Sequence, residues 1–424
     1  MRAPRRALFA AVTALAALVA CELLLFAAER VSGRAAALLH GASRAVPDAL
    51  LGERPNPALP EHDAAGWRNA ERPQHAFAVA IGDSQTYGEE VARPEAWPQR
   101  VAALSGLSVY NMALGGYGPV EYERLLPEAL ELSPRVVLVG LYAGNDFADA
   151  YLDAYPRARA TDLRSRDEAV LARVAELERA GELKDTWERT RDAGKGRRLG
   201  ALSRWLEPIA EHSRLLALGR AAGHALAGSN GSRAADAGDL EALRARAERA
   251  GPDLLLPFDQ GDLSTVFTPA ARLAVIDTSD PRVEEGLDIS LDRILRMAEV
   301  CAGRCKIAVV AIPTKELVFA AHVHASGKPV PRAFAELALR ETLVWERVQR
   351  ALDAAGIPLV PTLPALRALL DGGTNPYLRD WNGHPNAAGN EAIAEAVLAS
   401  GVLEPAAGDR ARAVDAPRTR RETR

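Results

Sequence analysis

Short apolar runs alternate with amphipathic segments over much of the chain. Five runs are rich in Val, Ile or Ala, and such runs are typical of strands buried on both faces: residues 76–82, 108–114, 135–142, 306–313 and 357–362. Between them a helical spacing of apolar residues occurs in residues 96–104, 120–132, 287–299, 334–355 and 387–399. This alternation predicts an α/β fold, a three-layer α/β/α sandwich with a mostly parallel sheet and helices on both faces.

Three segments do not follow this alternation. Residues 31–74 are rich in Ala, Pro and Arg, which predicts a linker that runs onto the globular domain. Residues 150–251 contain charged, Ala-rich segments and a Gly/Ser-rich break at 227–238. They predict a helical insertion, either a lid over the site or a partly disordered excursion. The catalytic domain would then cover residues 75–400, followed by a disordered tail over residues 401–424.

The first thirty residues have the pattern of a membrane signal anchor. Three arginines precede an almost wholly apolar stretch over residues 7–28, which is long enough to cross a bilayer as a transmembrane helix. The positive-inside rule then predicts a single-pass protein of a bacterial inner membrane, with everything after Glu29 in the periplasm or outside the cell. Two alternatives stay open. Cys21 follows a lipobox-like sequence and could be acylated in a lipoprotein, or the segment could be cleaved from a secreted protein.

The composition is that of an ordinary globular protein. The 424 residues include 52 Lys+Arg and 56 Asp+Glu, and this near-neutral balance excludes an electrostatic case for nucleic-acid binding. Three cysteines cannot build a disulfide framework or a four-cysteine zinc site. Cys301 and Cys305 could pair in an oxidising compartment or remain thiols. His322 and His324 have no cysteine or carboxylate cluster nearby, so no metal site is predicted.

Polar residues follow the first three predicted strands at the point where each strand ends. They occur in residues 82–86, 111–118 and 144–146. Because ligands of open parallel sheets bind at the carboxyl ends of the strands, these three loops should face one crevice. Ser84 lies in a tight strand-to-helix turn and is placed like an activated nucleophile. It needs a base, for which His384, just before the last predicted helix, is the best-placed residue.

Acyl transfer also needs donors aimed at the oxygen that becomes negative. The backbone N–H groups of Ser84 and Gly116 and the side-chain amide of Asn145 would form this oxyanion hole. Residues 314–316 follow the fourth predicted strand and point towards the crevice. They either contact substrate, with Lys315 as the candidate, or form the cap at a helix start. The chemistry needs no metal and no organic cofactor.

At these positions the sequence resembles the SGNH or GDSL-type hydrolases, whose four blocks each contribute one catalytic residue. The blocks match residues 82–84, Gly116 at five residues after Asn111, residues 144–146 and residues 384–386. The resemblance covers residues 77–147 and 305 to about 398, and it excludes the insertion. It implies a flavodoxin-like fold of the SGNH-hydrolase type and a serine esterase activity.

One position departs from the family pattern. The family normally has Asp three residues before the histidine, to hold the imidazole tautomer and stabilise its charged form, but here that position is Trp381. Asp380 is one residue too early and Asn382 one too late. Either a one-residue insertion lets Asp380 reach His384, or Asn382, a backbone carbonyl or a water molecule orients a catalytic dyad.

The resemblance implies a hydrolase of carboxylic esters, and the N-terminal segment predicts that it is exported and anchored in the membrane. O-acetyl groups on a cell-envelope polysaccharide are the expected substrate, and the expected partners are this ester substrate and the membrane. An O-acyltransferase or a lipase-like esterase acting on lipid esters stays open. The displaced aspartate also motivates a hypothesis of another class, a non-catalytic envelope module that binds glycan.

Overall fold

The computed structural model describes residues 3–31, 44–181, 183–195, 213–216, 218 and 237–404. The chain is organised around a sheet of five parallel strands in the order β4-β3-β5-β8-β9. The strands are β3 (Ala78–Gly82), β4 (Val109–Ala113), β5 (Val136–Tyr142), β8 (Lys306–Ile312) and β9 (Leu359–Pro361). Each strand lies within one of the five predicted apolar runs. The predicted parallel α/β fold is therefore confirmed.

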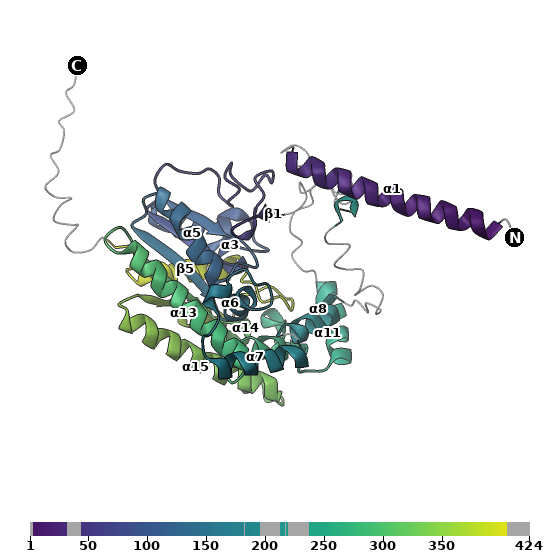
Figure 1. Ribbon diagram of the computed structural model, residues 1–424. Helices are drawn as coiled ribbons and strands as arrows, with labels where there is room; N and C mark the ends of the chain where they lie inside the picture. The colour runs from purple at the N-terminus through teal and green to yellow at the C-terminus, as the bar shows by residue number, and fades with distance from the viewer. Residues whose placement is uncertain are drawn as a thin grey trace, which may run out of the picture.

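Helices cover both faces of this sheet (Figure 1). One face carries α5 (Pro119–Glu131), α6 (Asp146–Ala154) and α13 (Pro281–Cys301), and the other carries α4 (Trp97–Ser105), α14 (Lys315–Ala325), α16 (Leu363–Asp371) and α17 (Ala387–Ala399). Helix α15 (Arg332–Ala354) contributes to both cores. Strand residues alternate between the faces, since Val79 and Val137 belong to the first core while Ala80 and Leu138 belong to the second.

The order of the sheet reverses at its first strand in the sequence. Strand β3 pairs with β4 on one side and with β5 on the other. In open α/β sheets such a reversal leaves a crevice at the carboxyl end of the strand, where ligands bind. The residues that follow β3 and β5 therefore lie where a site is expected.

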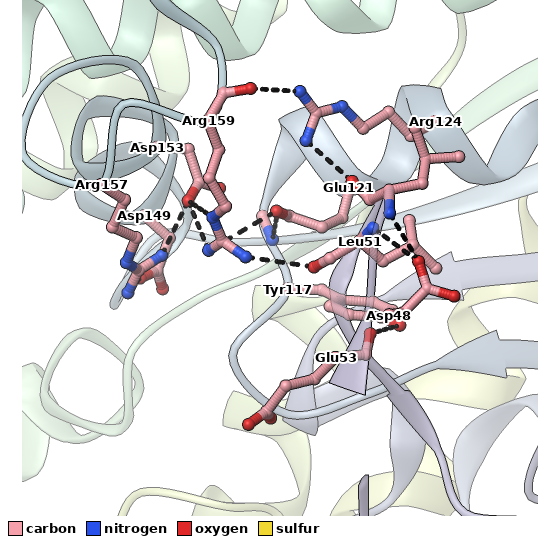
Figure 2. A network of polar contacts seen from close by, with 12 residues as sticks. Asp48, Leu51, Glu53, Tyr117, Glu121, Arg124, Asp149, Asp153, Arg157 and Arg159 are labelled. Carbon is pink, nitrogen blue, oxygen red and sulfur yellow. Dashed lines mark hydrogen bonds and ion pairs between the residues drawn. The ribbon is translucent and has the colours of Figure 1, made fainter. Parts of the chain in front are cut away.

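Of the predicted linker over residues 31–74, residues 44–74 pack against the domain, whereas residues 32–43 lie outside the described residues. Strands β1 (Ala45–Asp48) and β2 (Gly52–Pro55) pair as an antiparallel hairpin. Trp67 is fully buried, and its Nε1 donates to Glu128 of α5 at 2.9 Å. Figure 2 shows how polar contacts join the hairpin to α5 and to the chain after α6. The segment lacks an apolar period because much of its attachment is made by side-chain hydrogen bonds.

The insertion supplies a helical cluster at one end of the sheet (Figure 1). Within the predicted bounds it contains α7 (Glu168–Ala180), α8 (Asp185–Lys195) and α11 (Ala237–Ala250). It continues past the predicted end at residue 251 through the hairpin of β6 (Leu256–Phe258) and β7 (Thr265–Phe267) and through α12 (Pro269–Ala274), so the insertion is longer than the sequence predicts. Residues 150–154, which the sequence assigned to the insertion, belong to α6 instead. The predicted Gly/Ser-rich break at 227–238 lies mostly outside the described residues, as does the predicted tail from residue 405 onward.

The N-terminal residues 3–31 form the helix α1 (Ala3–Val31). A search of the described residues finds no helix whose length and apolar character suffice to span a membrane. The predicted transmembrane helix over residues 7–28 is therefore not found there. Cys21 is exposed and free.

Cys301 and Cys305 form a disulfide where α13 ends and β8 is about to begin. The sequence left open whether these cysteines pair or remain thiols, and in the structure they are paired.

Candidate active site

Ser84 lies at the carboxyl end of β3, in a turn where neighbouring side chains are sterically restricted. It is the first residue of the short helix α3 (Ser84–Tyr87), whose N-cap is Asp83, with a carboxylate that accepts from Gln85 N at 2.9 Å. A Cβ added to Gly82 would lie 2.1 Å from Thr86 Oγ1, so a side chain at this position would collide with the helix. The strand therefore runs directly into the turn and leaves the Ser84 hydroxyl at the crevice.

His384 reaches this hydroxyl from the opposite end of the sequence. Its Nε2 lies 3.0 Å from Ser84 Oγ, across 300 positions of the chain. Gly383 has a φ of 82°, a left-handed conformation that favours glycine. Asn386 then caps α17 by accepting from Gly389 N at 3.0 Å. The predicted pair of nucleophile and base is thus brought within hydrogen-bond distance.

The other imidazole nitrogen, His384 Nδ1, is buried and has no hydrogen-bond partner. The Asp380 carboxylate accepts from Asn382 N at 2.9 Å and makes no hydrogen bond with the ring, while the Asn382 amide donates to Glu90 Oε1 at 2.6 Å. The proposed swing of Asp380 onto His384 is not observed, and neither is a contact from the Asn382 side chain.

The electrostatic surroundings keep His384 neutral. Burial lowers the pKa of His384 to about 4; the negative charge of Glu89 opposes this shift and the positive charge of Arg272 adds to it. A neutral imidazole is the form that accepts a proton from a serine. The arrangement is therefore that of a Ser-His pair without a bound carboxylate.

Asn145 lies beside the same crevice as the N-cap of α6. Its Nδ2 donates to Asp149 Oδ2 at 2.9 Å and makes a longer contact of 3.4 Å with Asp146 Oδ1. A Cβ added to Gly116 would meet nothing within 4 Å, so lack of space does not require glycine at this position. Its φ of 89° does favour glycine, because other residues rarely adopt this left-handed conformation. The preceding residue, Gly115, approaches Ser84 closely, since its added Cβ would lie 3.4 Å from Ser84 Cβ.

Ser84, Asn145 and His384 open onto a small cavity of about 170 Å³, whereas Gly116 is not among its lining residues. Its walls come from the loops after β3 and β5, from the insertion, and from the loop between α16 and α17 that carries His384, here called the histidine loop. The lining residues are Ser84, Gln85, Tyr142, Gly144, Asn145, Asp149, Lys184, Trp187, Arg272, Val275, Asn382 and His384. The insertion therefore forms one side of the cavity, as a lid would.

The GDSL-like Lipase/Acylhydrolase family model matches residues 80–392, which is well over half of the chain. The chain belongs to this family. It is thus an ester-hydrolysing enzyme, and the match spans all four sequence blocks as well as the insertion between them. Among curated proteins, the comparison finds no match.

Solved structures similar to this GDSL-like hydrolase include three bacterial enzymes. A catalytic mutant of an acetylxylan esterase from Geobacillus stearothermophilus has 11% identity over 78% of this chain and 95% of that one, with a TM-score of 0.34. Phospholipase A1 from Streptomyces albidoflavus has 12% identity over 77% and 99%, with a TM-score of 0.36. An extracellular lipase from Streptomyces rimosus has 11% identity over 76% and 98%, with a TM-score of 0.35. At such scores nothing about the substrate follows.

Lys315 of the hydrolase does not face the cavity, contrary to the expectation that it contacts substrate. It is buried, and its Nζ donates to Asp380 O at 2.7 Å, to Val266 O at 2.9 Å and to Thr265 Oγ1 at 3.2 Å. Thr314 caps the helix by accepting from Leu317 N, so the alternative of a helix start is confirmed. Lys315 instead ties the histidine loop to the hairpin of the insertion.

Sequence reasoning missed Arg272, which contacts both catalytic loops of the hydrolase. Its guanidinium donates to Gly144 O at 3.0 Å and to Asn382 O at 2.9 Å, and it lies 4.8 Å from the centre of the Trp187 ring. Arg272 and Trp187 lie where the family pattern has no motif, so only their place in the fold reveals them.

The described residues contain no group of three or more His, Cys, Asp or Glu side chains arranged to hold a metal. His322, considered earlier as a ligand, instead pairs with Asp371 at 2.9 Å.

Proposed function

We propose that this hydrolase cleaves short carboxylic esters through an acyl-enzyme on Ser84, with O-acetyl groups of a cell-envelope polysaccharide as its substrate. The observation that carries the proposal is the 3.0 Å approach of His384 Nε2 to Ser84 Oγ at the wall of the cavity. The cavity of about 170 Å³ is small beside the pockets of about 300 Å³ and more that hold drug-sized ligands, which favours a short acyl group over a long chain.

The reaction would proceed in two steps. His384 Nε2 takes the Ser84 proton as Oγ bonds to the ester carbonyl carbon, and the carbonyl oxygen becomes negative. The N–H groups of Ser84 and Gly116 and the amide of Asn145 donate to this oxygen. The protonated histidine then gives its proton to the departing alcohol, and the acyl group stays on Ser84. Water activated by His384 releases the acid in the second step.

The same acyl-enzyme supports the O-acyltransferase alternative. There a sugar hydroxyl replaces water in the second step, so an acylated sugar is formed instead of free acid. A lipase-like esterase is the other alternative, and it would require a longer acyl chain than the cavity favours.

We also propose that the enzyme is exported and held at a bacterial inner membrane through residues 7–28, with its domain in the periplasm or outside the cell. The sequence supports this through the arginines that precede an apolar stretch. The Cys301–Cys305 disulfide supports an oxidising compartment. Cell fractionation of a tagged full-length chain tests it, with protease protection reporting the side of the membrane. Acylation at Cys21 would be detected by mass spectrometry as a lipid adduct.

Labelling by a fluorophosphonate serine probe tests the catalytic proposal. Wild-type protein should be labelled, and Ser84→Ala and His384→Ala should not, because one lacks the nucleophile and the other lacks the base. A folded wild-type protein that resists the probe would contradict the proposal. It would instead favour the glycan-binding module, for which the unpartnered His384 Nδ1 is the motivation.

The substrate is tested with esters of graded length and with an acetylated polysaccharide. Acetyl esters should be cleaved with a higher kcat/KM than octanoyl esters, since only the short group fits the cavity. A preference for octanoyl esters would favour the lipase-like alternative, and transfer of acetyl to an added sugar at the expense of free acetate would favour the transferase.

A further inference from the structure

The side-chain amide of Asn145 is held mainly by one carboxylate of its own helix. Asp149 follows four residues later in α6, and its N donates to Asn145 O at 2.8 Å, which places both side chains on the same face of the helix. Asn145 Nδ2 donates to Asp149 Oδ2 at 2.9 Å, whereas its contact with Asp146 is longer at 3.4 Å. The amide therefore makes one short hydrogen bond, to Asp149, while its contact with Asp146 is long and it also interacts with the Asp83 carboxylate.

Asp149 is itself fixed by cations on its other oxygen. Lys184 Nζ, which belongs to the insertion, lies 2.6 Å from Asp149 Oδ1, and Arg157 lies 3.4 Å from the same atom. The Asp149 side chain is only 3% exposed, while Lys184 is 28% exposed and lines the cavity. The contact with Lys184 is thus a direct link between the insertion and the loop that carries Asn145.

A polar network reaches Asp149 through Arg157 (Figure 2). Arg157 pairs with Asp153 at 3.0 Å, and Asp153 also pairs with Arg159 at 2.6 Å. Arg159 in turn donates to Leu51 O of the N-terminal hairpin at 3.1 Å. The carboxylate of Asp149 is thereby held between this network and Lys184, with little freedom to move.

We propose that Asp149 is a positioning residue of the oxyanion hole, and that Lys184 of the insertion holds it in place. The inference rests on the proposed function, in which Asn145 donates to the oxyanion. The short bond to Asp149 fixes the plane of the amide, and the N–H that is not bonded to Asp149 is the one that turns to the substrate oxygen. Donors that are already oriented stabilise the transition state without reorganising at the moment of reaction.

A double-mutant cycle tests whether Asp149 acts through Asn145. Asp149→Ala should lower kcat about tenfold with KM within about twofold, because an interaction made only in the transition state is weakened. Asn145→Ala should lower kcat by about a hundredfold, as loss of an oxyanion donor does. Adding Asp149→Ala to Asn145→Ala should change kcat by less than about twofold. The same tenfold loss in both backgrounds would overturn the proposal, because Asp149 would then act independently of Asn145.

Lys184→Met tests the role of Lys184 while the buried Asp149 side chain stays in place. It removes the cation and keeps the length of the side chain, so kcat should fall about threefold in the wild-type background and stay unchanged in the Asn145→Ala background. The matched control is Arg244→Met, which breaks the 2.8 Å ion pair with Asp259 elsewhere in the insertion and should leave kcat unchanged. Wild-type kcat in Lys184→Met, or an equal loss in the control, would overturn the role of Lys184.

Probe labelling separates failure of this inference from failure of the proposed function. If wild-type protein is labelled at Ser84 but the losses add in the cycle, only the positioning role of Asp149 is overturned. If wild-type protein is not labelled, the proposed function fails and the inference fails with it.

Discussion

The activity of the enzyme should persist to unusually acidic pH. As the base, His384 must be neutral, and burial lowers its pKa from the ordinary 6.5 to about 4. At pH 5 a group with a pKa of 4 is about 90% neutral, whereas a group with a pKa of 6.5 is about 3% neutral. We therefore expect kcat/KM at pH 5 to stay within about 20% of its value at pH 7, and to fall as the pH drops through about 4.

The assay is hydrolysis of p-nitrophenyl acetate in buffers from about pH 3.5 to pH 8, with samples quenched into alkaline buffer so that the product is read at one pH. The profile of kcat/KM reports groups of the free enzyme. Two variants test the cause of the shift. Arg272→Gln removes a cation that lowers the His384 pKa, so the acid limb of the profile should shift to higher pH. Glu89→Gln removes an anion that raises this pKa, so the acid limb should shift to lower pH.

Asp83 is a second group whose titration would affect the profile, and a variant of it is the control. Burial raises the pKa of Asp83 to about 7, and its carboxylate lies 3.4 Å from Ser84 Oγ. Asp83→Asn keeps a cap for α3, and in this variant the acid limb should still lie near pH 4. A wild-type midpoint between about pH 6 and pH 7 that persists in Asp83→Asn would refute the argument, because His384 would then titrate as an exposed histidine does.

Three variants test the packing and contacts that hold the site. Gly286→Ala should lower the free energy of unfolding by about 2 kcal/mol, because its added Cβ would lie 1.9 Å from Phe147 O of α6. Lys315→Met should cost about 2 kcal/mol and lower kcat, because buried carbonyls of the histidine loop and the hairpin lose their donor. Replacing both Cys301 and Cys305 by Ala should cost about 2 kcal/mol through the short loop that they close. Urea denaturation measures all three.

Each has a matched control. Gly372→Ala meets nothing closer than Ala368 O at 3.3 Å, Lys306→Met changes an exposed lysine, and Cys21→Ala changes an exposed free thiol. The free energy of unfolding of all three control variants should stay within about 1 kcal/mol of the wild-type value. If a test variant is no less stable than its control, the contact assigned to it does not stabilise the fold.

Much of the sheet could be predicted because its signal is local. A strand buried on both faces must be apolar along its length, so runs such as residues 135–142 mark β5 directly. Only the start of helix α14 is among the predictions, and the rest of the helix has no amphipathic pattern, for a related reason. Most of its residues are buried, so no polar face marks a helical period. Residues 44–74 have the local pattern of a linker because their attachment relies on side-chain contacts with distant residues, such as the hydrogen bond from Trp67 to Glu128.

The sequence by itself determined the family blocks and therefore the candidate nucleophile, base and oxyanion amide, since Ser84, His384 and Asn145 lie in short motifs next to strands and helices that are locally encoded. Only the tertiary structure decided what surrounds them. It leaves His384 Nδ1 without a partner, turns Lys315 away from the cavity, and brings Lys184 of the insertion against Asp149. The physical reason is that a pKa, a hydrogen bond or a cavity wall depends on groups far apart in the chain, and their approach is set by packing that no local pattern records.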